Sequence, residues 1–173
     1  MKRSLSIVPA LLVTALTTLT ALMLPVLAAY AAPITFVANL SQANEVPPTG
    51  STATGFASVV LDPTTQTIQV NVTFSGLTTP DNAAHIHCCL PSPLDAGVNI
   101  GVATTLPAFP GFPLNVTSGT YSSAVLSLLD AGTYNPAFVT AQGSLALAAA
   151  ALVTGIENEE TYLNIHTTMF SGR

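Results

Sequence analysis

The segment that most constrains the fold is a run in which apolar and polar side chains alternate. It lies within residues 66–75 and reads Gln-Thr-Ile-Gln-Val-Asn-Val-Thr-Phe-Ser. In an extended chain, successive side chains point to opposite faces. One face would therefore carry every apolar side chain of the run, namely Ile68, Val70, Val72 and Phe74. This period of two predicts a half-buried strand, so the fold must contain a sheet with one side on a hydrophobic core.

Several other segments have the same extended, turn-bounded character. The turn Asp62-Pro63-Thr64-Thr65 would join the alternating run to a preceding hairpin partner. Proline-rich stretches at 91–93 and 107–113 exclude central strands there. We expect further strands at residues 34–40, 55–61, 83–89, 98–105, 120–129 and 161–167.

One segment has helical periodicity instead. Asn135 followed by Pro136 is typical of a helix N-cap and first helical residue. Apolar residues then recur at spacings of three and four from Phe138 to Ile156, and Gly155 is a stop signal. We expect one helix without a chemical role, laid across one end of a sheet. The sequence thus predicts a mostly β fold, an antiparallel sandwich or barrel with one inserted helix.

The N-terminal residues have the character of a secretory signal peptide. Lys2 and Arg3 precede an apolar stretch at 5–27, and Ala29-Tyr30-Ala31 offers a small-residue cleavage site. An uncleaved membrane anchor is the alternative, because the run is long enough to span a bilayer. Prolines and threonines within the run disfavour it. We expect a signal peptide at 1–31, a single domain at 32–173, and a secreted, periplasmic or cell-surface location.

Charge is scarce and mostly negative. The chain has eight acidic and three basic residues, and only Arg173 would remain as a base after residue 31. The formal charge of the mature chain would be 1 − 8 = −7. Without a basic patch, nucleic acid is excluded as a partner. The protein would contact a membrane only through its signal peptide, during export.

The histidines are the candidate chemical site. His85 and His87 lie one residue apart in an expected strand, so they would share a face. The remaining histidine, His166, lies in another expected strand. Imidazole is a common ligand of copper and zinc. These residues are candidate metal ligands; in the alternative, the imidazoles form a polar network with backbone carbonyls or Asp81.

Cys88 and Cys89 are the only cysteines. Free thiols are rare in oxidising compartments. Three interpretations remain open: a disulfide between these neighbours, a disulfide between two molecules, or Cys89 as a thiolate ligand beside the histidines. No Gly-x-Ser-x-Gly elbow or phosphate-binding glycine loop is present, so the residues point to no catalytic group.

The sequence resembles the CHRD (chordin-type) domains of secreted bacterial proteins. The resemblance rests on 36–48 (Phe-Val-Ala-Asn-Leu-Ser-Gln-Ala-Asn-Glu-Val-Pro-Pro), on Ser51-Thr52-Ala53-Thr54-Gly55 and on Ser75-Gly76-Leu77-Thr78. Ala84-His85-Ile86-His87 and Tyr162-Leu163-Asn164-Ile165-His166-Thr167 follow in the same order. The resemblance implies a β-sandwich, secretion and no assigned enzymatic activity. The family usually continues from the last motif into a closing strand, so we expect the domain to be truncated at that strand.

The histidine pattern is also similar to that of copper–zinc superoxide dismutases, whose fold is likewise an antiparallel β-barrel. A bridging histidine, a zinc-ligand set and an active-site arginine have no counterpart here. What remains is a mononuclear copper or zinc site of three nitrogens. We therefore expect an extracytoplasmic binding or scaffolding domain, immunoglobulin-like or superoxide-dismutase-like in fold, without catalysis. Its partner would be an unknown protein or surface ligand. The alternatives are a mononuclear copper-site redox protein and a cell-surface or matrix interaction module.

Overall fold

The computed structural model describes residues 31–90 and 98–171. The expected signal peptide lies outside these residues except for Ala31. Two short 3-10 turns occur at Gln42–Asn44 and Ala131–Thr133. The strands and helices are β1 (Ile34–Ser41), β2 (Thr54–Asp62), β3 (Thr67–Ser75), β4 (Asp81–Cys88), β5 (Gly119–Ser122), β6 (Leu126–Ser127), α1 (Pro136–Gln142), α2 (Leu145–Glu157) and β7 (Thr161–Thr167).

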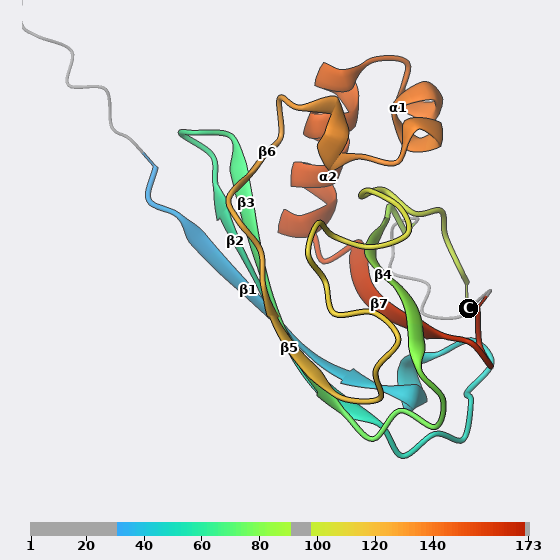
Figure 1. Ribbon diagram of the computed structural model, residues 1–173. Helices are drawn as coiled ribbons and strands as arrows, with labels where there is room; N and C mark the ends of the chain where they lie inside the picture. Colours follow the sequence, from blue (N-terminus) through green and yellow to red (C-terminus); the bar gives the residue numbers. More distant parts are fainter. Residues whose placement is uncertain (1–30, 91–97, 172–173) are drawn as a thin grey trace, which may run out of the picture.

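The strands form two antiparallel sheets. The larger sheet has the order β1-β2-β3-β5, and β6 also pairs with β3. The smaller sheet pairs β4 with β7. Figure 1 shows the larger sheet on one side, β4 and β7 beside it, and both helices together at one end. The predicted mostly β antiparallel fold is confirmed, and its arrangement is sandwich-like rather than a closed barrel.

The hydrophobic core lies between the two sheets and the helices. All four apolar side chains of the alternating run in β3 are buried, as the pattern predicts. Ala84 and Ile86 of β4 join the same core, as do Phe138 of α1 and Leu152 of α2. Helix α2 packs on both β4 and β7. The smaller sheet is therefore fixed by contacts to the helices as well as by its own ladder.

Two expected strands are wrong in part. Residues 98–105 follow β4 but make only isolated bridges, His87 with Val102 and Thr104 with Tyr134. The Thr104 hydroxyl accepts the backbone N–H of Ile86 at 2.9 Å, so a side chain replaces a rung of the ladder. The strand expected at 120–129 is split into β5 and β6. Here the hydroxyl of Ser123 accepts the N–H of Val70 at 2.9 Å in place of a backbone carbonyl, while the N–H of Ser123 still donates to the carbonyl of Val70.

The single expected helix is also wrong, because the structure has two helices bent by 96°. The predicted N-cap is present, since the Asn135 side chain accepts from the backbone N–H of Ala137. Gly143 then ends α1 with a φ of +90°, a conformation that favours glycine. Ser144 caps α2 through its hydroxyl, and Gly155 lies inside α2 rather than at its end. Local capping thus overrides the continuous apolar spacing.

Within the described ranges, neither helix alone has the length and hydropathy of a bilayer span, and the bent α1–α2 pair meets that criterion only as a pair.

The role of Gly155 gives a test of the packing between α2 and the cysteines. A Cβ on Gly155 would lie 2.7 Å from the Cys88 Sγ and 3.1 Å from the Cys89 Sγ. Alanine is the better helix former by about 1 kcal/mol. We nevertheless expect Gly155→Ala to lower the free energy of unfolding by about 1–3 kcal/mol, the usual cost of overpacking. Urea denaturation of the original protein and the variant measures this difference in free energy.

The matched control is Thr154→Ala at the neighbouring exposed position of the same helix. This change should leave stability equal or slightly raised, because it alters only helix propensity. A Gly155→Ala protein as stable as the Thr154→Ala protein would contradict the close packing of α2 on the cysteines.

Candidate metal centre

The pairing of β4 with β7 brings all three histidines of the chain together. In its register Ala83 faces His166, His85 faces Asn164 and His87 faces Tyr162. His166 is therefore diagonal to His85, within reach on the same face of the ladder. The ring centroids are 4.6 Å apart for His85 and His166, 4.8 Å for His85 and His87, and 5.6 Å for His87 and His166.

The donor atoms lie close to the spacing that one metal ion requires. One ring nitrogen from each histidine can be chosen so that all three lie within 4.8 Å of one another. The Nε2 atoms of His87 and His166 are 3.4 Å apart. Two nitrogens that bind one ion at about 2.0–2.1 Å can be at most about 4.2 Å apart. The widest separation, up to 4.8 Å, exceeds this limit by about 0.6 Å, so a ring must shift for one ion to contact all three nitrogens.

Hydrogen bonds assign the tautomer of His87 and leave one nitrogen in each of the other two rings without a partner among the described residues. The Nδ1 of His87 donates to the backbone carbonyl of Ile100 at 2.7 Å, which leaves Nε2 as the atom with a lone pair. The Nδ1 atoms of His85 and His166 are buried without a hydrogen-bond partner among the described residues. Buried polar atoms without a partner are costly. A bound metal ion would accept the lone pair of an imidazole nitrogen that otherwise has no partner among these residues.

The alternative of a polar network holds for His87 and in part for His166, whose Nε2 lies within hydrogen-bond distance of the His87 Nε2. His87 has a backbone carbonyl as its partner, as that hypothesis requires. Asp81 instead accepts the backbone N–H of Val116 through Oδ1 at 2.8 Å. The Asp81 carboxylate thus ties β4 to the loop before β5.

Burial keeps the imidazoles neutral. The exposed fractions of His85, His87 and His166 are only 4%, 6% and 5%. Desolvation, together with the neighbouring imidazoles, lowers the pKa of His85 to about 3. Desolvation and His87 lower the pKa of His166 to about 4, against an opposing backbone hydrogen bond to Phe170. Desolvation also lowers the pKa of His87, against the opposing bond to Ile100. Neutral imidazole is the form that binds metal, so protons do not compete near neutral pH.

Tyr162 and Ile100 hold the ring of His87 in place. Tyr162 stacks on His87 with centroids 4.6 Å apart and an interplanar angle of 12°. Its hydroxyl accepts the backbone N–H of Ile100 at 3.2 Å, while the carbonyl of Ile100 accepts from His87. Partners of this kind orient metal-binding histidines in many sites. Sequence reasoning missed Tyr162, although the period of two from His166 places it on the histidine face.

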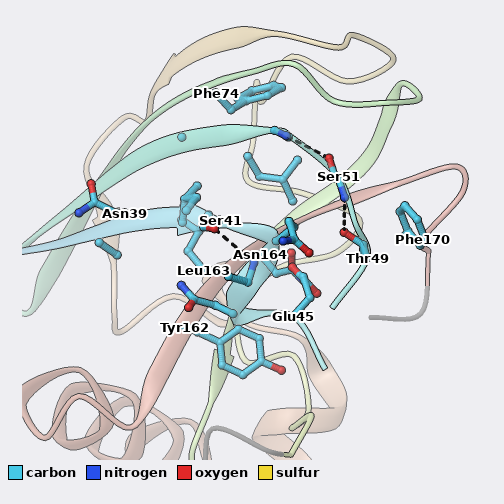
Figure 2. A pocket seen from close by; sticks show the side chains of 18 of the residues that line it. Asn39, Ser41, Glu45, Thr49, Ser51, Phe74, Tyr162, Leu163, Asn164 and Phe170 are labelled. Atoms are coloured by element: carbon cyan, nitrogen blue, oxygen red, sulfur yellow. Dashed lines mark hydrogen bonds between the residues drawn. The ribbon is translucent and has the colours of Figure 1, made fainter. Parts of the chain in front are cut away.

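Tyr162 also lines a groove of about 430 Å³ beside the centre. The groove lies between β1, the turn that follows it, and β7, and Figure 2 shows Tyr162 and Asn164 on its β7 side. Ser41 at the end of β1 and Glu45 in the turn after it also line the groove. The histidines do not line this groove. Tyr162 is thus the side chain that contacts both the groove and His87.

The cysteines do not belong to the centre. Cys88 and Cys89 are joined by a disulfide, which is the first of the three interpretations given above. A Cβ on Gly155 of α2 would touch both sulfurs, so both lie against that helix. Strand β4 ends at Cys88, and Cys89 therefore does not continue the histidine face. The structure gives no support to Cys89 as a thiolate ligand.

The lowered pKa values predict a pH-dependent stability of the metal-free protein. Between about pH 6.5 and 5 the histidines of the unfolded chain take up protons, while those of the native state stay neutral. The unfolded state then binds more protons, so the free energy of unfolding falls as the pH falls. Each histidine contributes at most about 1.4 kcal/mol per pH unit. Urea denaturation across this range measures the slope.

A His85→Gln variant is the control. Its free energy of unfolding should change less per pH unit than that of the unchanged protein, by about the contribution of one histidine. Burial raises the pKa of Asp81, which acts with the opposite sign, so the observed slope understates the histidine contribution. A stability that is flat from about pH 6.5 to 5 would contradict the buried neutral imidazoles.

The comparison with known proteins agrees with the motifs noted above. No curated protein and no solved structure shows significant similarity to the chain. The likeness of the histidine pattern to copper–zinc superoxide dismutases therefore stays a prediction. The family model named CHRD domain matches residues 36–173, which include all the described strands except the start of β1. The chain therefore belongs to the CHRD domain family.

Proposed function

We propose that this protein is an extracytoplasmic binding domain that holds one metal ion, copper or zinc, through His85, His87 and His166, without catalysing a reaction. The observation that carries the proposal is the convergence of three buried imidazoles from two strands; in two of them Nδ1 has no hydrogen-bond partner among the described residues. CHRD domains are generally extracellular, and membership of the family supports a secreted location.

The chemistry of the donors supports a metal ion over other small ligands. Imidazole nitrogen suits copper and zinc. The bond from His87 to the carbonyl of Ile100 fixes which nitrogen is free, as partners of metal-binding histidines commonly do. The groove between β1 and β7 mixes apolar and polar side chains with the carboxylate of Glu45, and among the described residues it contains no comparable cluster of donors that would define one ligand. The metal centre therefore carries the proposal ahead of the interaction-module alternative.

The proposal predicts one ion per chain. Purified mature protein equilibrated with one equivalent of copper or zinc and then desalted should retain one ion, as measured by elemental analysis. His87→Ala should weaken binding by more than the 10–100-fold that loss of an outer-shell partner typically costs. Thr154→Ala, at an exposed position of α2 that offers no ligand to the cluster, is the control and should keep the ion.

Circular dichroism of each variant separates loss of a ligand from loss of the fold. Metal retained equally by a folded His87→Ala protein would show that the ion binds elsewhere and would contradict the proposal.

The charge of the protein argues against a dismutase and for holding the ion. The mature chain carries a net charge near −7 and one terminal base, so its field repels an anionic reactant. We expect copper-loaded protein to dismute superoxide no faster than the same amount of free copper. Rapid, His166-dependent dismutation would instead favour the alternative of a copper-site redox protein.

A further inference from the structure

We infer that the ion for which this centre is built is monovalent copper, Cu(I), in preference to Cu(II) or Zn(II). The inference rests on the metal-binding function proposed above and narrows it to one oxidation state. Three features carry it: the charge of the donors, their burial and their number.

The first feature is that every donor is neutral. The cluster of potential ligand atoms consists of three histidines, with no carboxylate or thiolate among the described residues that form it. The buried carboxylate of Asp81 accepts a backbone N–H of the neighbouring loop, and the cysteine sulfurs are bonded to each other. An ion at the centre therefore keeps its full formal charge.

The second feature is burial. With exposed fractions of 4–6%, the three rings are almost entirely removed from water. The cost of transferring an ion from water to such surroundings is large, and in a continuum description it rises with the square of the charge. With only neutral ligands, the desolvation free energy of a divalent ion would be about four times that of a monovalent ion. Burial thus favours Cu(I) by charge alone.

The third feature is the number of donors. Where a protein supplies only three zinc ligands, a water completes the four-coordinate shell, and Cu(II) prefers tetragonal surroundings, so both divalent ions need a ligand beyond three imidazoles. The described residues supply three imidazole nitrogens. Cu(I) has a filled d shell and is satisfied by three ligands. The geometry and the charge of the centre therefore favour the same ion.

Few other side chains of the mature chain would compete for copper in a binding measurement. Its three histidines all belong to the centre. Once the signal peptide is removed, Met169 is the only methionine, and it is 58% exposed. Ascorbate keeps copper reduced without reducing disulfides, so the cysteines stay bonded, which a thiol assay confirms.

The test compares dissociation constants of the mature protein for Cu(I), Cu(II) and Zn(II), each against a chelator of known affinity, with Cu(I) handled under argon. We expect one Cu(I) per chain, bound at least about 100-fold more tightly than Cu(II). At 59 mV per tenfold for one electron, this ratio raises the copper potential by about 120 mV. Met169→Leu should leave all three constants unchanged.

A charge-changing variant tests the reason for the preference. His166→Asp replaces a neutral donor by an anionic one at the same strand position. It should move the Cu(I)-to-Zn(II) affinity ratio at least about tenfold towards the divalent ion, because a carboxylate offsets part of its charge. If this variant does not fold, the ratio measured for the unchanged protein decides the matter.

Two outcomes separate this inference from the function on which it rests. Zn(II) or Cu(II) bound through the histidines as tightly as Cu(I) would overturn the preference for Cu(I) and leave the metal-binding function standing. Absence of any histidine-dependent binding, for all three ions, would overturn both.

Discussion

The register between β4 and β7 is the constraint on which the site depends. Only this register places His166 diagonally opposite His85 and puts Tyr162 against His87. A slip of one residue would turn every side chain of one strand to the other face. His166 would then enter the core, and Ile165 would take its place among the polar rings. The register is held because Ala84, Ile86, Leu163 and Ile165 all belong to the hydrophobic core or pack against it.

The same packing that fixes the register also sets the chemistry of the histidines. Residues 98–109 run along β4, where the N–H of Ala103 donates to the carbonyl of Ile86 and the N–H of Cys88 donates to Gly101. This segment covers the strand edge and brings Ile100 to His87. Burial then keeps the pKa values low, and within residues 31–90 and 98–171 two Nδ1 atoms have no hydrogen-bond partner. Such unsatisfied polar groups destabilise a native state unless a ligand uses them, which is why they point to function.

The sequence predicted those parts of the fold that depend on local pattern. The alternation in β3 and the N-cap at Asn135 both appear as expected, because each depends on neighbours in the chain. The shared face of His85 and His87 follows from the same period of two. The break between the helices was missed because apolar spacing continues across Gly143 and Ser144, whose capping overrides it.

Features that depend on distant residues could not be derived in this way. The Ser123 hydroxyl takes the place of a backbone acceptor only because Val70 lies opposite, and Ile100 matters only because the loop returns to β4. Likewise, the meeting of His166 with the other two histidines needs a pairing that no local pattern specifies. Sequence reasoning could name these three residues as candidates, but their convergence is a property of the tertiary structure.

Long-range ¹H–¹⁵N NMR of the imidazole nitrogens can distinguish one buried centre from three independent histidines, because the chain has only these three. Three neutral rings are expected at about pH 6, below the usual histidine pKa. One equivalent of metal should shift the signals of all three rings together. A ring that titrates near pH 6.5, or a His166 signal unmoved by the metal that shifts His85 and His87, would contradict a single buried centre.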